Sequence, residues 1–90
     1  MPYNNVAQKI QALYALPFGG KASGRFRIPE KLVKDMMGRK RLYPEDRTEL
    51  ARALFELGFV LIDMDSFFVV MSANSFVNYR RVSKDVLEHL

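Results

Sequence analysis

The sequence predicts a small α+β domain, in which three helices and a short strand precede a β-hairpin and a C-terminal extension. Apolar residues recur at helical spacing in three segments before residue 58. Two apolar runs separated by a short polar turn follow them. Ninety residues with 49% hydrophobic composition are enough for one folded domain with a modest core. We therefore expect a single domain over residues 1–90, with a core drawn from about 5–72 and a C-terminal segment from 73–90.

The first third of the chain predicts one helix and one strand. The helix is expected over residues 6–16, where apolar residues recur at i, i+4 and i+7 from Val6 and where Asn5 can cap the start. A small, polar and flexible connector is expected at 20–24. A short half-buried strand is expected at 25–28, because charged and apolar residues alternate there.

The next two helices each begin at a proline and end at a glycine. One is expected from Pro29 to Gly38, and the other covers residues 44–57, before Gly58. A bare basic turn at 39–41 separates them. In the later helix the apolar residues Leu50, Leu54 and Leu57 predict the buried stripe, widened by Ala51, Ala53 and Phe55.

A hairpin is predicted from strands at 59–62 and 67–71, with its turn inside 63–66. Simple alternation gives two apolar faces, with Phe59, Leu61, Phe67, Val69 and Met71 on one and Val60, Ile62, Met64, Phe68 and Val70 on the other. In a hairpin with one solvent-exposed face, apolar and polar residues alternate along each strand instead. We therefore expect both faces or an edge to be covered, by the C-terminal segment or by a second copy of the chain. The sequence favours a homodimer through the hairpin or the C-terminal segment. Within the C-terminal segment, Ser83 can cap a last helical turn.

Positive charge is concentrated between Lys21 and Arg52. This stretch holds ten of the fourteen cations against five acids, whereas residues 53–79 hold three acids and no cation. A local positive field of this kind is typical of proteins that bind a polyanion. Duplex DNA is the expected partner, and RNA is not excluded.

The order of the predicted elements resembles the winged-helix domain, a helix-turn-helix variant with a hairpin wing, over about residues 5–72. The resemblance rests on this order, on the helix ends at Gly38 and Gly58, and on the passage 57–59 from the last helix to the hairpin. It implies that the helix at 44–57 takes the place of the recognition helix. It also implies a dimeric DNA-binding transcription regulator.

Two features depart from that family's pattern. The outward face of the helix at 44–57 is mostly acidic, and so is the expected wing tip at 63–65. Carboxylates are poorly suited to a groove lined with phosphate. The basic turn is the alternative contact, and the sequence leaves open which of the two makes the main one. The candidate DNA-binding residues are Lys31, Lys34, Arg39, Lys40, Arg41, Arg47, Thr48, Arg52, Arg80 and Arg81.

The sequence predicts a repressor that acts by promoter occlusion. The alternative is a protein-interaction module, a winged-helix-like adaptor or anti-activator without DNA binding, which the acidic helix face and the apolar hairpin favour.

No catalysis, metal or cofactor is expected. The chain has no cysteine, and its one histidine, His89, is the penultimate residue. Asp63 and Asp65 predict a polar turn, and Glu45 and Asp46 are expected to stabilise a helix start through its dipole. No apolar run approaches the roughly 20 residues of a membrane span, and no leader pattern begins the chain. We expect a cytoplasmic protein that does not enter a membrane.

Overall fold

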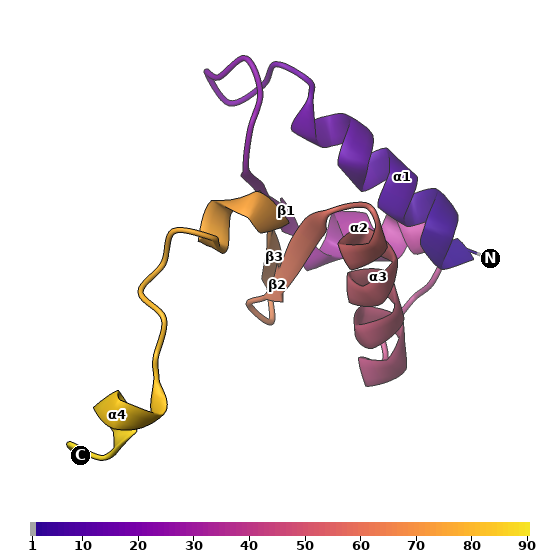
Figure 1. Ribbon diagram of the computed structural model, residues 1–90. Coiled ribbons are helices and arrows are strands. Elements are labelled where there is room, and N and C mark those ends of the chain that lie inside the picture. Colours follow the sequence, from indigo (N-terminus) through magenta and orange to yellow (C-terminus); the bar gives the residue numbers. More distant parts are fainter. Residues whose placement is uncertain (1) are drawn as a thin grey trace.

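A computed structural model describes residues 2–90, which form four α-helices, one 3₁₀-helix and a three-stranded antiparallel sheet. The α+β class expected from the sequence is confirmed. In Figure 1, α1, α2 and α3 lie together beside the sheet, whereas α4 lies apart near the C-terminus. The elements in chain order are α1 (Pro2–Tyr14), β1 (Phe26–Pro29), α2 (Glu30–Met37), α3 (Pro44–Glu56), β2 (Phe59–Asp63), β3 (Phe67–Ser72), the 3₁₀-helix η1 (Ala73–Phe76) and α4 (Lys84–Leu87).

The hydrophobic core lies between the three long helices and the inner face of the sheet. The sheet order is β1–β3–β2, so β3 is the central strand and supplies two fully buried side chains. Each such side chain stabilises the fold by about 1.5–3 kcal/mol. The largest fully buried side chains are Ile10, Val33, Leu50, Leu54, Phe68 and Val70.

The strand register corrects the grouping of apolar residues expected from simple alternation. β2 pairs with β3 so that Leu61 lies opposite Val70 and Ile62 lies opposite Val69. The tight turn around Asp65, which has a φ of 69°, fixes this register. The inner face therefore carries Phe59, Leu61, Phe68 and Val70. We call the opposite side the outer sheet face, formed by Val60, Ile62, Phe67, Val69 and Met71.

The start of α1 and the connector after it also differ from expectation. Helix α1 begins at Pro2, so Asn5 lies inside the helix and does not cap it. The connector contains a tight turn, in which Phe18 and Lys21 exchange two backbone hydrogen bonds of 3.0 and 3.1 Å. Gly19 and Gly20 both have positive φ there, which glycine adopts without strain.

The expected ends of α2 and α3 are confirmed to within a residue. Gly38 has a φ of 69° and ends α2 in the left-handed conformation. Pro29 belongs to β1 and precedes α2 as its N-cap. In α3, Phe55 is 65% exposed, which corrects its place on the inner stripe. It follows buried Leu54 by about 100° around the helix and therefore points away from the core.

The C-terminal segment from residue 77 leaves the body of the molecule, and we call residues 77–90 the C-terminal arm. All of them are exposed. The radius of gyration is 15.4 Å, against about 12 Å for a compact chain of this length. Ser83 caps α4 as expected, because its side chain accepts the Val86 N–H. In this structure the arm packs on no residue of the core, and it does not cover the hairpin of its own chain.

Candidate nucleic-acid interface

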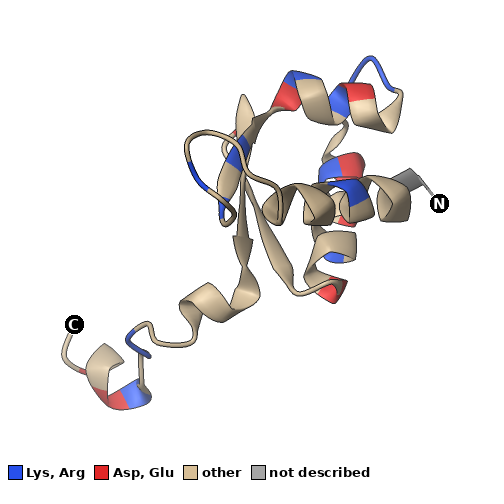
Figure 2. Cartoon of the chain, turned by 90° about the horizontal axis from the view of Figure 1, so that it is seen from above, with Lys and Arg blue, Asp and Glu red and all other residues tan. Residues whose placement is uncertain are grey.

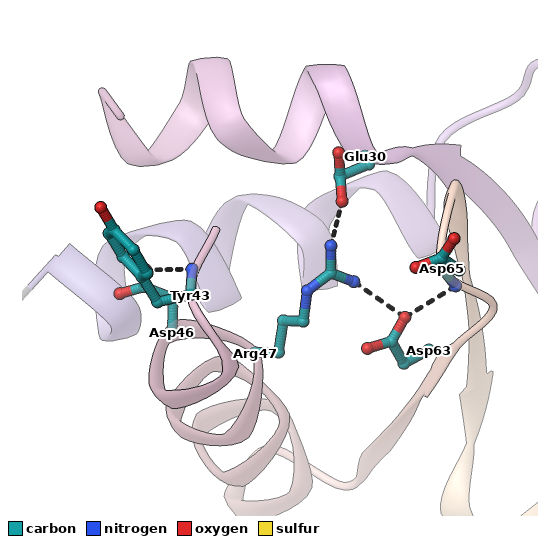
Figure 3. A network of polar contacts seen from close by, with 6 residues as sticks. All are labelled: Glu30, Tyr43, Asp46, Arg47, Asp63 and Asp65. Carbon is teal, nitrogen blue, oxygen red and sulfur yellow. Dashed lines mark hydrogen bonds and ion pairs between the residues drawn. The ribbon is translucent and has the colours of Figure 1, made fainter. Parts of the chain in front are cut away.

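The side chain of Arg47 lies inside a polar network rather than on the surface of α3 (Figure 3). Its guanidinium pairs with Glu30 of α2 and donates to Asp63 of β2 at 2.8 Å. It also lies 5.1 Å from the ring centroid of Phe68. Burial alone would lower the pKa of Arg47, but the two carboxylates raise it, so the charge persists. At 18% exposure this residue holds three elements together and presents little surface to a phosphate.

Asp46, the neighbour of half-buried Arg47, is a fully buried charge at 3% exposure. Its carboxylate accepts the Tyr43 N–H and the Tyr3 hydroxyl, both at 2.9 Å, and pairs with Arg39 at 3.0 Å. Burial would raise the pKa of Asp46, but these partners outweigh burial and lower it. The hydrogen bond that the Tyr3 hydroxyl donates to Asp46 raises the pKa of Tyr3. Beyond the helix-dipole role expected for it, Asp46 therefore also joins Tyr3 and Arg39 to the start of α3.

This network engages one cation of the basic turn in an ion pair, although the side chain of Arg39 stays 38% exposed. Arg39 pairs with Asp46, and its guanidinium also lies 5.9 Å from the ring centroid of Tyr3. Lys40 and Arg41 are exposed and make no ion pair within residues 2–90. The turn thus offers two free cations instead of three.

The outward face of α3 is acidic, as expected. Thr48 is exposed, and Arg52 pairs with Glu49 at 3.3 Å, an exposed pair of little energetic weight. Glu45 and Glu56 are exposed on the same helix. This face therefore carries more negative than positive charge.

Ion pairing leaves the local excess of positive charge unchanged. Of the ten cations between residues 21 and 52, the described structure pairs three, and it pairs three of the five acids. Seven cations then remain against two acids, Asp35 and Glu45. The free cations are Lys21, Arg25, Arg27, Lys31, Lys34, Lys40 and Arg41.

Four of these cations belong to α2 and the turn that follows it. We call Lys31, Lys34, Lys40 and Arg41 the α2–turn surface. Lys31 and Lys34 are three residues apart and so lie on one face of the helix. Figure 2 shows blue ribbon on α2 and on the turn after it, at the same end of the molecule. The backbone N–H of Arg39 donates to the Lys34 carbonyl at 3.0 Å and fixes how the turn leaves the helix.

The other three free cations line a hollow beside the connector, which sequence reasoning missed. Lys21, Arg25 and Arg27 surround a space of about 240 Å³. Phe18 and Phe26 meet edge to face in its wall, with centroids 5.6 Å apart. The absence of any acid before residue 30 would have pointed to this region.

Arg80 and Arg81 lie on the C-terminal arm and are exposed. They are on a segment that runs away from the body (Figure 1), and the structure does not join them to the α2–turn surface. Tyr79 beside them packs edge to face against Phe76 with centroids 5.3 Å apart.

Comparison with protein-family models, with curated proteins and with solved structures gives no match. Within residues 2–90, no group of three or more His, Asp or Glu side chains is placed to hold a metal ion. None of the helices described is long and apolar enough to span a bilayer. Charge, burial and geometry are therefore the observations that bear on function.

Proposed function

We propose that the protein is a small winged-helix-like regulator that binds duplex DNA through the α2–turn surface. The observation that carries the proposal is the unpaired charge between residues 21 and 52, where seven free cations remain against two acids. Phosphate contacts by such cations release counterions and supply most of the non-specific affinity of DNA-binding proteins.

The architecture supports the winged-helix part of the proposal. Three helices precede a hairpin, and the short strand between the first two helices joins that hairpin in one sheet. The hairpin would then take the position of the wing, and α3 that of the recognition helix.

The charge distribution favours docking through α2 and the basic turn over docking through α3. Arg47 would have to break two ion pairs to reach DNA, and the remaining exposed face of α3 is acidic. Thr48 and Arg52 stay the candidates for contact with base edges. The hollow with Lys21 and Arg25 supplies a second place for backbone contact.

The regulatory outcome that fits this proposal is repression. A dimer bound across a two-fold site in the cytoplasm would occlude a promoter, because a protein of 90 residues that covers DNA excludes other proteins from the same stretch.

Binding of the intact chain to a labelled duplex, measured by fluorescence anisotropy at about 50 and 200 mM salt, tests the proposal. We expect Arg41→Glu to weaken binding at least about tenfold, since a phosphate contact becomes repulsive. Lys9→Glu makes the same charge change at an exposed position of α1, outside the α2–turn surface. It should weaken binding less than about threefold, because salt screens a charge that does not contact the duplex. Absence of binding by the unaltered chain at low salt, or equal effects of the two variants, would refute the proposal.

One observation favours the alternative of a protein-interaction module. A groove of about 520 Å³ runs between α3 and β2, and exposed Phe55 lines it together with Val60 and Leu61. An exposed aromatic residue beside an apolar groove is a common anchor for a protein partner. If Phe55→Asp abolishes function in the cell while DNA binding is unchanged, the groove and not the cationic surface is the functional site.

A further inference from the structure

The outer sheet face is a set of five large apolar side chains with no helix of the core above it. Helices α1, α2 and α3 contribute to the core on the inner face. Each of the five outer residues keeps a fraction of its surface open to solvent. Arg27 lies on the same face, 5.9 Å from the ring centroid of Phe67. A contiguous apolar face of this kind marks an interaction site.

The C-terminal arm is a second apolar surface without a partner. Its large apolar side chains are 54–101% exposed and lie on a segment that packs on no core residue. Isolated exposed apolar residues are ordinary, but six within 14 residues are not. The six are Val77, Tyr79, Val82, Val86, Leu87 and Leu90.

We propose that two copies of the chain exchange their C-terminal arms, so that each arm packs on the outer sheet face of the other copy. The inference deepens the dimeric part of the proposed function and does not depend on DNA binding. The partner is a second copy because one chain carries both surfaces, and a two-fold axis satisfies both at once.

The path of the chain supports packing of the arm on a second copy rather than on the sheet of its own chain. Residues 80–83 are extended and place α4 away from the sheet of its own chain (Figure 1). At about 3.3 Å per residue, this stretch spans roughly 13 Å, enough to cross to a neighbouring molecule.

The charges of the two surfaces and the area that they would bury are also consistent with arm exchange. The arm carries Arg80 and Arg81, whereas the hairpin turn beside the outer sheet face is acidic, with Asp65 unpaired within residues 2–90. An exposed Val or Leu side chain presents on the order of 100 Å² to water, so the six large apolar side chains of each arm together bury about 1,200 Å² in a dimer. The two outer sheet faces add less, because their side chains are already half-buried. A stable protein interface buries about 1,200–2,000 Å².

Sedimentation velocity of the full chain at micromolar concentration gives the first test. We expect a species of twice the 10.4 kDa chain mass. Val86→Asp with Leu87→Asp should raise the dissociation constant at least about 100-fold, because two carboxylates would be buried in an apolar contact. The circular dichroism spectrum should be unchanged, since neither residue belongs to the core. Glu88→Gln on the same arm should leave the dimer intact.

Cysteine pairing distinguishes exchange from other arrangements, because the chain has no cysteine of its own. A Val69→Cys chain and a Leu87→Cys chain with different tags should form a mixed disulfide when they are combined under mild oxidation. The inference is overturned if the unaltered chain is monomeric, or if the arm variant still dimerises. It is also overturned if a chain with both substitutions forms only an intrachain disulfide at monomer mass.

Discussion

Asp46 and Arg47 are neighbours in the sequence, and both charges are withdrawn from solvent for structural reasons. A buried charge is tolerated only when partners replace the water it loses. Asp46 has three partners, and Arg47 has two carboxylates and an aromatic ring. Neither residue is therefore available for recognition, although both stand at the start of the helix that the winged-helix resemblance assigns to the DNA groove.

Replacement of Asp46 by Asn should destabilise the fold by about 1–2 kcal/mol at neutral pH, since the hydrogen bonds to a charged acceptor are lost. The folded state lowers the pKa of Asp46 from the ordinary 3.8. A lowered carboxyl pKa adds stability above the unfolded value, and that stability disappears as pH falls through the folded value.

The difference in unfolding free energy between the original chain and Asp46→Asn should consequently be largest near pH 7 and shrink below pH 3.8. Urea unfolding at a series of pH values measures it. A difference that stays constant down to pH 2 would show that the carboxylate charge is not what stabilises this site.

At the scale of elements, the ends of α2 and α3 were predictable, whereas the start of α1 and the strand register were not. Pro44, Gly38 and Gly58 have strong local conformational preferences, and α2 and α3 end where those residues require. Register depends on the geometry of one tight turn, and the sequence 63–66 contains no residue pair that specifies a turn type. A change of one residue in that turn exchanges the two faces of a strand.

The candidate site was predictable only in part for a similar reason. Lys31 and Lys34 are brought together by helical spacing in α2, and Lys40 and Arg41 follow in the turn directly after that helix. The role of Asp46 depends on Tyr3, which is 43 residues away. No local pattern reports such a contact, so the sequence alone could not show that Arg39 is engaged.

The helix α2 should contribute to DNA binding through phosphates and not through bases. Lys31→Ala with Lys34→Ala should lower the slope of log affinity against log salt by about 0.9 for each phosphate that the protein no longer neutralises. The reduction in affinity should be similar for unrelated duplex sequences. Anisotropy titrations between about 50 and 200 mM salt measure the slope. A sequence-dependent reduction would instead indicate that α2 reaches base edges.

At the scale of the whole molecule, Arg47 connects parts of the chain that are distant in sequence. It joins the first residue of α2, the body of α3 and the last residue of β2. The hairpin is thereby fixed to the helical part by side chains as well as by the core.

Arg47→Met should therefore destabilise the fold by about 1–3 kcal/mol, because half-buried Glu30 and exposed Asp63 would both lose their partner. Arg52→Met removes an exposed pair on the same helix and should change stability by less than about 0.5 kcal/mol. Urea unfolding monitored by circular dichroism compares the two. Similar effects of both substitutions would contradict the structural role of Arg47.

The anchoring of the hairpin turn to α2 through Arg47 also limits how the protein adapts to a ligand. The hairpin cannot close over a bound duplex as an independent flap. If the protein binds DNA as proposed, a duplex that contacts both α2 and the hairpin must instead adjust its own curvature to this surface. Preference among target sequences would then follow from the flexibility of individual base-pair steps, even where no side chain reaches a base.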